Sequence, residues 1–204
     1  MSVGCFFGNR CRVNGSCVVE TWRALVLDAL RAAGLPDYIE TTDLDAAEAR
    51  YETLHNEVRF GCDSLGSGSL AQLARSVALK RGDQAGPLRD LINSTEQIFV
   101  PGVFEQRISA PKLPNDCLWS IGALQAALRE TALTLGLPLS NGEVPDAPLP
   151  KISRFKKLSK HDSASDDCDE HGWYMLEDYR PGWLTLSEFA RVAQMHQIAL
   201  VLAG

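Results

Sequence analysis

Two Gly-Leu-Pro tripeptides, at residues 34–36 and 136–138, each follow a segment in which apolar residues recur with helical spacing. Glycine adopts the left-handed backbone that closes a helix, and proline cannot continue one, so each tripeptide predicts a helix end. The segments before them, 18–33 and 119–135, are therefore predicted to be helices. The apolar face of the first comprises Trp22, Leu25, Val26, Ala29 and Leu30.

Shorter elements are predicted from apolar runs and helical patterns that lie between turn residues. Strands are predicted at residues 3–7, 37–41, 97–100, 152–158, 172–179 and 198–202. Further helices are predicted at residues 45–58, 69–80, 87–93 and 185–196. Residues 61–68 are predicted to form a loop of small residues, and residues 103–115 match no single pattern.

This succession of elements predicts an α/β or α+β fold with a small mixed sheet and about five helices. The chain has 204 residues, of which 45% are hydrophobic and 23% charged, and this composition is typical of a folded domain rather than a disordered chain. Residues 140–150 are rich in proline, glycine and aspartate and are predicted to be a long loop. We therefore expect one domain over residues 1–204 with this loop inside it.

Two segments, 69–75 and 185–191, resemble each other residue by residue. Each has a hydroxyl residue followed three positions later by glutamine or glutamate, the capping-box pattern of a helix start. Each is followed by an apolar strand and preceded by a helix that ends in Gly-Leu-Pro. Two interpretations stay open: a duplication giving two related helix–helix–strand halves with a ligand groove between them, or chance recurrence of common helix signals.

The net charge, the length of the apolar runs and the N-terminus disfavour several classes of partner and location. The net charge is −6, which disfavours binding to the phosphate backbone of a nucleic acid. No apolar run reaches the roughly 20 residues of a membrane-spanning helix, and the N-terminus lacks the basic start of a signal peptide. We therefore expect a cytoplasmic protein that binds neither nucleic acid nor membrane. Its cysteines are predicted to be reduced: Cys5, Cys11, Cys17, Cys62, Cys117 and Cys168.

Neither a cofactor nor a metal is predicted. Residues 66–71, Gly-Ser-Gly-Ser-Leu-Ala, fit a loose dinucleotide-binding pattern but lack the buried strand that should come before it. Cys5, Cys11 and Cys17 are separated by five residues each, whereas paired zinc ligands are separated by about two to four. The polar run 161–171 contains four side chains of the types that bind metals, in no recognised spacing: His161, Asp167, Cys168 and His171.

The segment 154–183 is predicted to be a hairpin with an acidic tip and aromatic residues beside it. Tryptophan and tyrosine anchor protein interfaces, and acidic side chains attract a basic partner, so this segment is the predicted site for a basic protein. The alternative is a structural hairpin whose aromatic side chains are buried and whose basic and acidic strands face each other. The candidate partner-binding residues are Asp166, Asp167, Asp169, Glu170, Trp173, Tyr174, Glu177, Asp178 and Tyr179.

The C-terminal residues 182–191, with the terminal apolar run 198–202, resemble bacterial toxin-immunity proteins. The resemblance implies a small acidic cytoplasmic protein that inhibits a cognate toxin or enzyme by binding it, and it transfers no functional residue. Our hypothesis is therefore a non-catalytic protein-binding module. The alternative is a small hydrolase-like enzyme whose site is assembled from dispersed histidine, aspartate and cysteine residues, although no Gly-x-Ser-x-Gly nucleophile motif is present.

Overall fold

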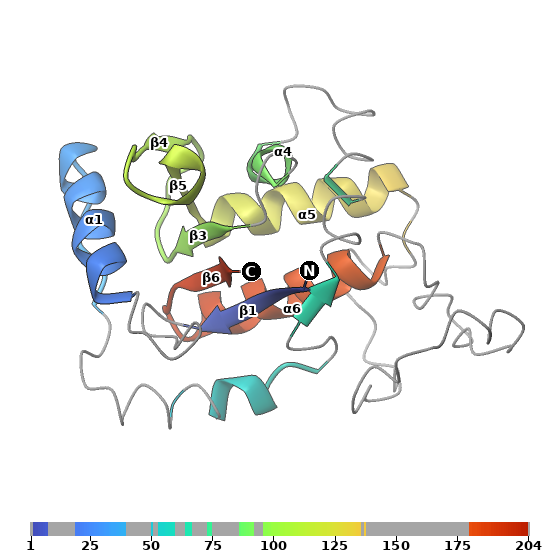
Figure 1. Ribbon diagram of the computed structural model, residues 1–204. Helices are drawn as coiled ribbons and strands as arrows, with labels where there is room; N and C mark the ends of the chain where they lie inside the picture. Colours follow the sequence, from blue (N-terminus) through green and yellow to red (C-terminus); the bar gives the residue numbers. More distant parts are fainter. Residues whose placement is uncertain are drawn as a thin grey trace, which may run out of the picture.

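The computed structural model shows a mixed sheet with helices packed on both of its faces (Figure 1). It describes residues 2–7, 19–39, 50, 53–59, 64–66, 73–74, 86–91, 96–135, 137 and 180–203. Within these ranges the architecture is of the α+β class, as predicted. Among the helices in the described ranges, none combines the length and the apolar character that crossing a membrane requires.

Six strands of the described chain form one sheet in the order β2-β1-β6-β3-β5-β4. β3 runs parallel to β5 and antiparallel to β6, and every other neighbouring pair is antiparallel. β1, β3 and β5 therefore share one direction. The strands are β1 (Ser2–Phe7), β2 (Ser64–Gly66), β3 (Gln97–Val100), β4 (Ile108–Ser109), β5 (Cys117–Ser120) and β6 (Leu200–Ala203).

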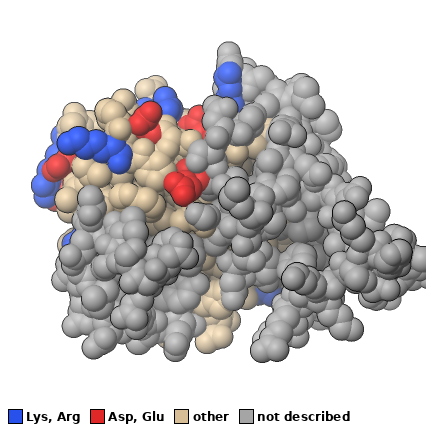
Figure 2. Space-filling view, in the orientation of Figure 1, with Lys and Arg blue, Asp and Glu red and all other residues tan. Residues whose placement is uncertain are grey.

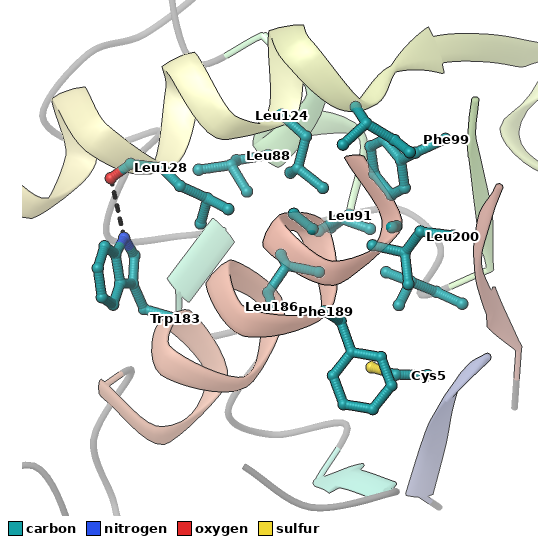
Figure 3. Close-up of a cluster of buried hydrophobic side chains, with 14 of the residues drawn as sticks. Cys5, Leu88, Leu91, Phe99, Leu124, Leu128, Trp183, Leu186, Phe189 and Leu200 are labelled. Carbon is teal, nitrogen blue, oxygen red and sulfur yellow. Dashed lines mark hydrogen bonds between the residues drawn. The ribbon is translucent and has the colours of Figure 1, made fainter. Parts of the chain in front are cut away.

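The central strands are buried on both faces, with side chains alternating between two cores. On one face, Phe99 and Leu200 pack beneath three helices, α4 (Pro87–Asp90), α5 (Ile121–Leu135) and α6 (Arg180–Met195). Figure 3 shows this core, in which the Trp183 indole also donates a hydrogen bond of 2.9 Å to the Leu128 carbonyl. On the other face, Ile98 and Val201 pack with α1 (Val19–Ala32).

Several predicted elements are confirmed. The helix at 18–33 is α1, and Gly34 closes it with φ +71°, the left-handed backbone that glycine accepts without strain. The strands at 3–7 and 97–100 are β1 and β3, and the terminal strand is β6, shifted to Leu200–Ala203. Residue 50 and residues 53–56 are helical within predicted helix 45–58, and so are residues 73–74 within predicted helix 69–80.

Other predictions are wrong in instructive ways. Residues 37–39 are not a strand, and the predicted loop 61–68 contains β2. The helix predicted from residue 119 begins at Ile121, because residues 117–120 form β5. Ser120 ends that strand and caps the helix, since its Oγ accepts the Ala123 N–H at 2.9 Å.

Helix α6 begins at Arg180, which corrects two predictions. The predicted hairpin 154–183 does not extend to its last residues, because these are helical. Thr185 and Glu188 are also not a capping box at a helix start, since both are buried inside α6. The corresponding start of the first segment, residues 69–72, lies outside the described residues. The strands that follow the two segments, β3 and β6, have different outer neighbours: β1 is antiparallel to β6, whereas β5 is parallel to β3. The arrangement of strands gives the duplication no support.

The segment 103–115, which matched no pattern, forms the edge of the sheet. It contains the two-residue strand β4 and leads into the short 3-10 helix η2 (Pro114–Asp116). Asn115 and Asp116 adopt left-handed backbones, with φ of 58° and 51°. Asparagine and aspartate tolerate this conformation better than other residues with a side chain, so the chain can turn sharply here from β4 into β5.

Candidate binding cleft

A cleft of about 680 Å³ lies between the C-terminal end of α1 and the segment 104–109 at the edge of the sheet. The helical side is lined by small residues, among them Ala29 and Ala32, and ends at Leu35. Because alanine side chains are short, the last turns of α1 leave room for a ligand. The opposite side contributes Phe104 and Ile108, whose side chains are only half-buried and so leave apolar surface accessible.

Arg107 connects this cleft to a buried polar cluster behind it. Its Nε lies 3.4 Å from Asp90 Oδ2, and its Nη2 donates a hydrogen bond of 2.9 Å to the Asn115 carbonyl. The Arg107 side chain is 49% exposed, whereas that of Asp90 is 21% exposed. On one side the Arg107 guanidinium is therefore held by the Asn115 carbonyl and the Asp90 carboxylate, and its other side faces the cleft.

Asp90 is the centre of the polar cluster. Its Oδ2 accepts a hydrogen bond of 2.8 Å from Trp119 Nε1 and a weaker one from Cys117 Sγ at 3.4 Å. Asn115 Nδ2 donates to Gln97 Oε1 at 2.9 Å, and the Gln97 amide in turn lies against Cys117. These bonds join the end of α4 to β3 and β5, and the ion pair of Asp90 with Arg107 connects them to the segment that lines the cleft.

Cys117 is a poor candidate for a nucleophile despite its polar neighbours. Its side chain is fully buried, and this burial raises the pKa of the thiol more than the contacts with Arg107 and Gln97 lower it. Since the thiolate rather than the thiol is the reactive form, a buried thiol with a raised pKa stays protonated and unreactive at neutral pH. The role of the cluster is therefore to hold Arg107 and Trp119 in position, and Cys117 does not serve as a nucleophile in it.

Removing the Asp90 carboxylate is expected to destabilise this edge of the protein. In Asp90→Ala, Trp119 Nε1 loses its acceptor and Arg107 its counter-charge, so the free energy of unfolding should fall by about 2 kcal/mol. Urea denaturation measures the change. Asp28→Ala is the matched control, since Asp28 is 74% exposed and lies 3.9 Å from its arginine, and it should change stability by less than about 0.5 kcal/mol. If both variants change the free energy of unfolding equally, the buried contacts of Asp90 contribute no more stability than an exposed ion pair.

A second polar cluster joins α6 to the segment 50–59. The Glu188 carboxylate is buried and accepts hydrogen bonds from Arg59 Nη2 at 2.8 Å and from Arg191 Nη2 at 3.0 Å. Burial alone would raise the pKa of Glu188, but the hydrogen bonds from the two arginines outweigh it and hold the pKa below its usual value. His196 Nε2 lies 2.8 Å from Glu57 Oε2, which adds a contact between the same two segments.

All nine predicted partner-binding residues, from Asp166 to Tyr179, lie outside the described residues, so their grouping stays a prediction. Three other predictions also fall outside them: the loop at 140–150, the strands at 152–158 and 172–179, and the polar run 161–171. Cys5 and Cys117 are both buried and are not bridged to each other, and the other four cysteines, Cys11, Cys17, Cys62 and Cys168, lie outside the described residues or have no described side chain. In the part of the chain that is described, no three histidine, cysteine or acidic side chains are grouped as metal ligands would be.

The sequence did not predict the cleft, although Ala29 and Leu35 of its lining belong to the predicted first helix and its end. Arg107 and Phe104 lie in the segment that matched no pattern, and Asp90 approaches Arg107 only through the folding of α4 against β5. The left-handed pair Asn115-Asp116 directly before an apolar run was the one local indication of a sharp turn at a strand edge.

Comparison with family models, with curated proteins and with solved structures finds no match to this chain.

Proposed function

We propose that this chain is a non-catalytic protein-binding module, an immunity or inhibitor protein that blocks a cognate toxin or another enzyme in the cytoplasm. The observation that carries the proposal is the open cleft at the sheet edge, with an apolar lining from Leu35, Phe104 and Ile108. Val103, which precedes Phe104 in the chain, is also fully exposed. Apolar surface bordered by charged side chains is typical of protein interaction sites.

The chemistry of the lining supports binding over catalysis. Small and apolar side chains dominate the cleft, and its one guanidinium, Arg107, is engaged with Asp90 and Asn115. The hydrolase-like alternative would need a reactive group, and the pKa of Cys117 is raised by burial, the wrong direction for a nucleophile. On the face drawn in Figure 2, acidic and basic side chains lie among uncharged ones at the end of the molecule that carries α1 and β4.

The proposal is tested by comparing the proteins that the chain captures from the native cell when the cleft is open and when a side chain fills it. Ala32→Arg places a long side chain in the cleft, and because Ala32 is exposed the helix should fold unchanged. Ala126→Arg is the matched control, since Ala126 is an exposed helical alanine on α5, which packs on the other face of the sheet.

We expect the unmodified chain and Ala126→Arg to retain the same protein from the native cell, identified by mass spectrometry, and Ala32→Arg to lose it. The captured protein should also lose activity when mixed with the unmodified chain and keep it when mixed with Ala32→Arg. Equal capture by all three chains would show that the cleft is not the interface. A captured enzyme or toxin whose activity is unaffected would contradict the inhibitor role.

A further inference from the structure

We propose that the cleft binds an extended, basic segment of the partner protein, which adds as a new strand to the outer edge of β4. This inference rests on the proposed binding function and specifies the chemistry of the partner. Three features of the described residues carry it: the backbone groups at the edge of β4, the apolar lining beside them, and the balance of charge around the cleft.

The first feature is the register of β4 against β5. Among the described strands β4 is the last of the sheet, with Ser109 opposite Cys117, and Ala110 N–H donates to the Asp116 carbonyl at 3.0 Å. In an antiparallel pair only alternate residues direct their backbone groups at the partner strand. Since Ala110 does so, Ser109 directs its N–H and carbonyl away from β5. Ser109 also lines the cleft, so these groups face the space that a further strand would occupy.

The second feature is where the side chains of an added strand would lie. Successive side chains of a strand point to opposite faces, so every second residue of the bound segment would face α1. On that side the small residues Ala29 and Ala32, together with Leu35, form an apolar surface with room for a side chain of moderate size. The bound segment should therefore alternate apolar residues with polar ones.

The third feature is the charge around the cleft. Glu105 lines the cleft and is exposed, whereas the charge of Arg107 is already matched by Asp90. Beside the cleft on α1, Arg31 is likewise matched, because it pairs with Asp37 at 2.6 Å and lies 3.9 Å from the exposed Asp28. Among the charged side chains named here, both arginines are paired with carboxylates and the acidic side chains outnumber the basic ones, so a segment carrying lysine or arginine is the complementary ligand.

The test uses three synthetic peptides and the full chain labelled with ¹⁵N. The first probe is an eight-residue peptide of alternating valine and lysine with blocked ends. The second replaces lysine with glutamate, and the third is the lysine peptide with alternate backbone nitrogens methylated, which removes its edge hydrogen bonds. We expect the lysine peptide to shift the Ser109 amide resonance and to slow its hydrogen exchange. The other two should bind at least about tenfold more weakly, the cost of about one net hydrogen bond or charge contact.

A pair of variants tests the same edge from the protein side. Ser109→Pro removes the N–H that faces the cleft and leaves the bonds to β5 in place, and proline is tolerated on edge strands. Ser109→Ala keeps the N–H and is the matched control. We expect Ser109→Pro to weaken binding of the lysine peptide by about tenfold, and Ser109→Ala to bind it as the unmodified chain does.

Three results would overturn strand addition: equal binding of the lysine and glutamate peptides, equal binding of the methylated peptide, or a Ser109 amide that does not respond. The methylated peptide keeps the test decisive if Ser109→Pro does not fold. Failure of this inference is distinct from failure of the proposed function. If only strand addition is wrong, Ala32→Arg still abolishes capture of the partner, whereas if the cleft is not an interface, Ala32→Arg captures it normally.

Discussion

Replacing Glu188 with glutamine is expected to lower the free energy of unfolding by about 3 kcal/mol at pH 7. The Glu188 side chain is 2% exposed, and its two oxygens accept hydrogen bonds from the side chains of Arg59 and Arg191. Glutamine has nearly the same shape but no charge, so both guanidiniums would lose their shared counter-ion. Their side chains are 36% and 35% exposed, which lets water compensate in part and keeps the loss at the lower end for a broken buried pair.

The pH dependence of this loss of stability shows whether the substitution acts through the charge of Glu188 or through packing. The folded-state pKa of Glu188 is lowered from its ordinary value of 4.5, so the ionised carboxylate contributes stability that is fully present above about pH 4.5. That contribution is lost as the pH falls through the folded-state pKa, because the folded protein then protonates Glu188 as the unfolded chain does. The difference in free energy of unfolding between the unmodified protein and Glu188→Gln should therefore become smaller below pH 4.5.

Urea denaturation between pH 7 and pH 3 measures both effects. Glu105→Gln is the control, since Glu105 is exposed. The stability of this variant should follow that of the unmodified protein from pH 7 to pH 3. A gap for Glu188→Gln that stays constant down to pH 3 would show that the substitution acts through packing, and that the two arginines do not depend on the charge of Glu188.

Local patterns predicted those elements whose signals lie within a few residues. Gly34 ends α1 as expected, because a left-handed closure needs only its own backbone freedom. Strand β5 was missed because its four residues run directly into α5, and a short apolar run beside a helix has no periodicity of its own. The start of α6 was misplaced because Thr185 and Glu188 match a capping box, whereas Pro181, the second residue of the helix, was the better start signal.

The candidate cleft could not be predicted, because its parts come from distant segments. Arg107 is oriented by Asp90, which precedes it by seventeen residues and lies on another element. Glu188 likewise meets Arg59 across 129 residues of chain. Charged residues such as these look like ordinary surface positions in a sequence, and only the packing of helices against the sheet shows which are held together. The partner-binding surface at residues 166–179 remains a prediction. The cleft at β4 is a second candidate for the partner-binding site.

The largest loss of stability is expected from Phe189→Ala. Phe189 is fully buried on α6 (Figure 3). Its ring stacks on Phe7 of β1 with centroids 4.9 Å apart and an interplanar angle of 17°. Truncation removes this contact and leaves a cavity between the helix and the sheet, so the free energy of unfolding should fall by about 4 kcal/mol. For a chain of this size the Tm should fall by about 10 °C.

Leu133→Ala provides the comparison for that loss, since Leu133 is 79% exposed on α5 and should change stability by less than about 0.5 kcal/mol. The core around Phe189 and the cleft beside α1 lie on opposite faces of the sheet. Below its lowered Tm, Phe189→Ala should therefore bind the alternating lysine peptide with unchanged affinity. Calorimetry and the peptide titration test this directly: a parallel loss of binding in the folded variant would show that the α6 core also supports the edge of β4.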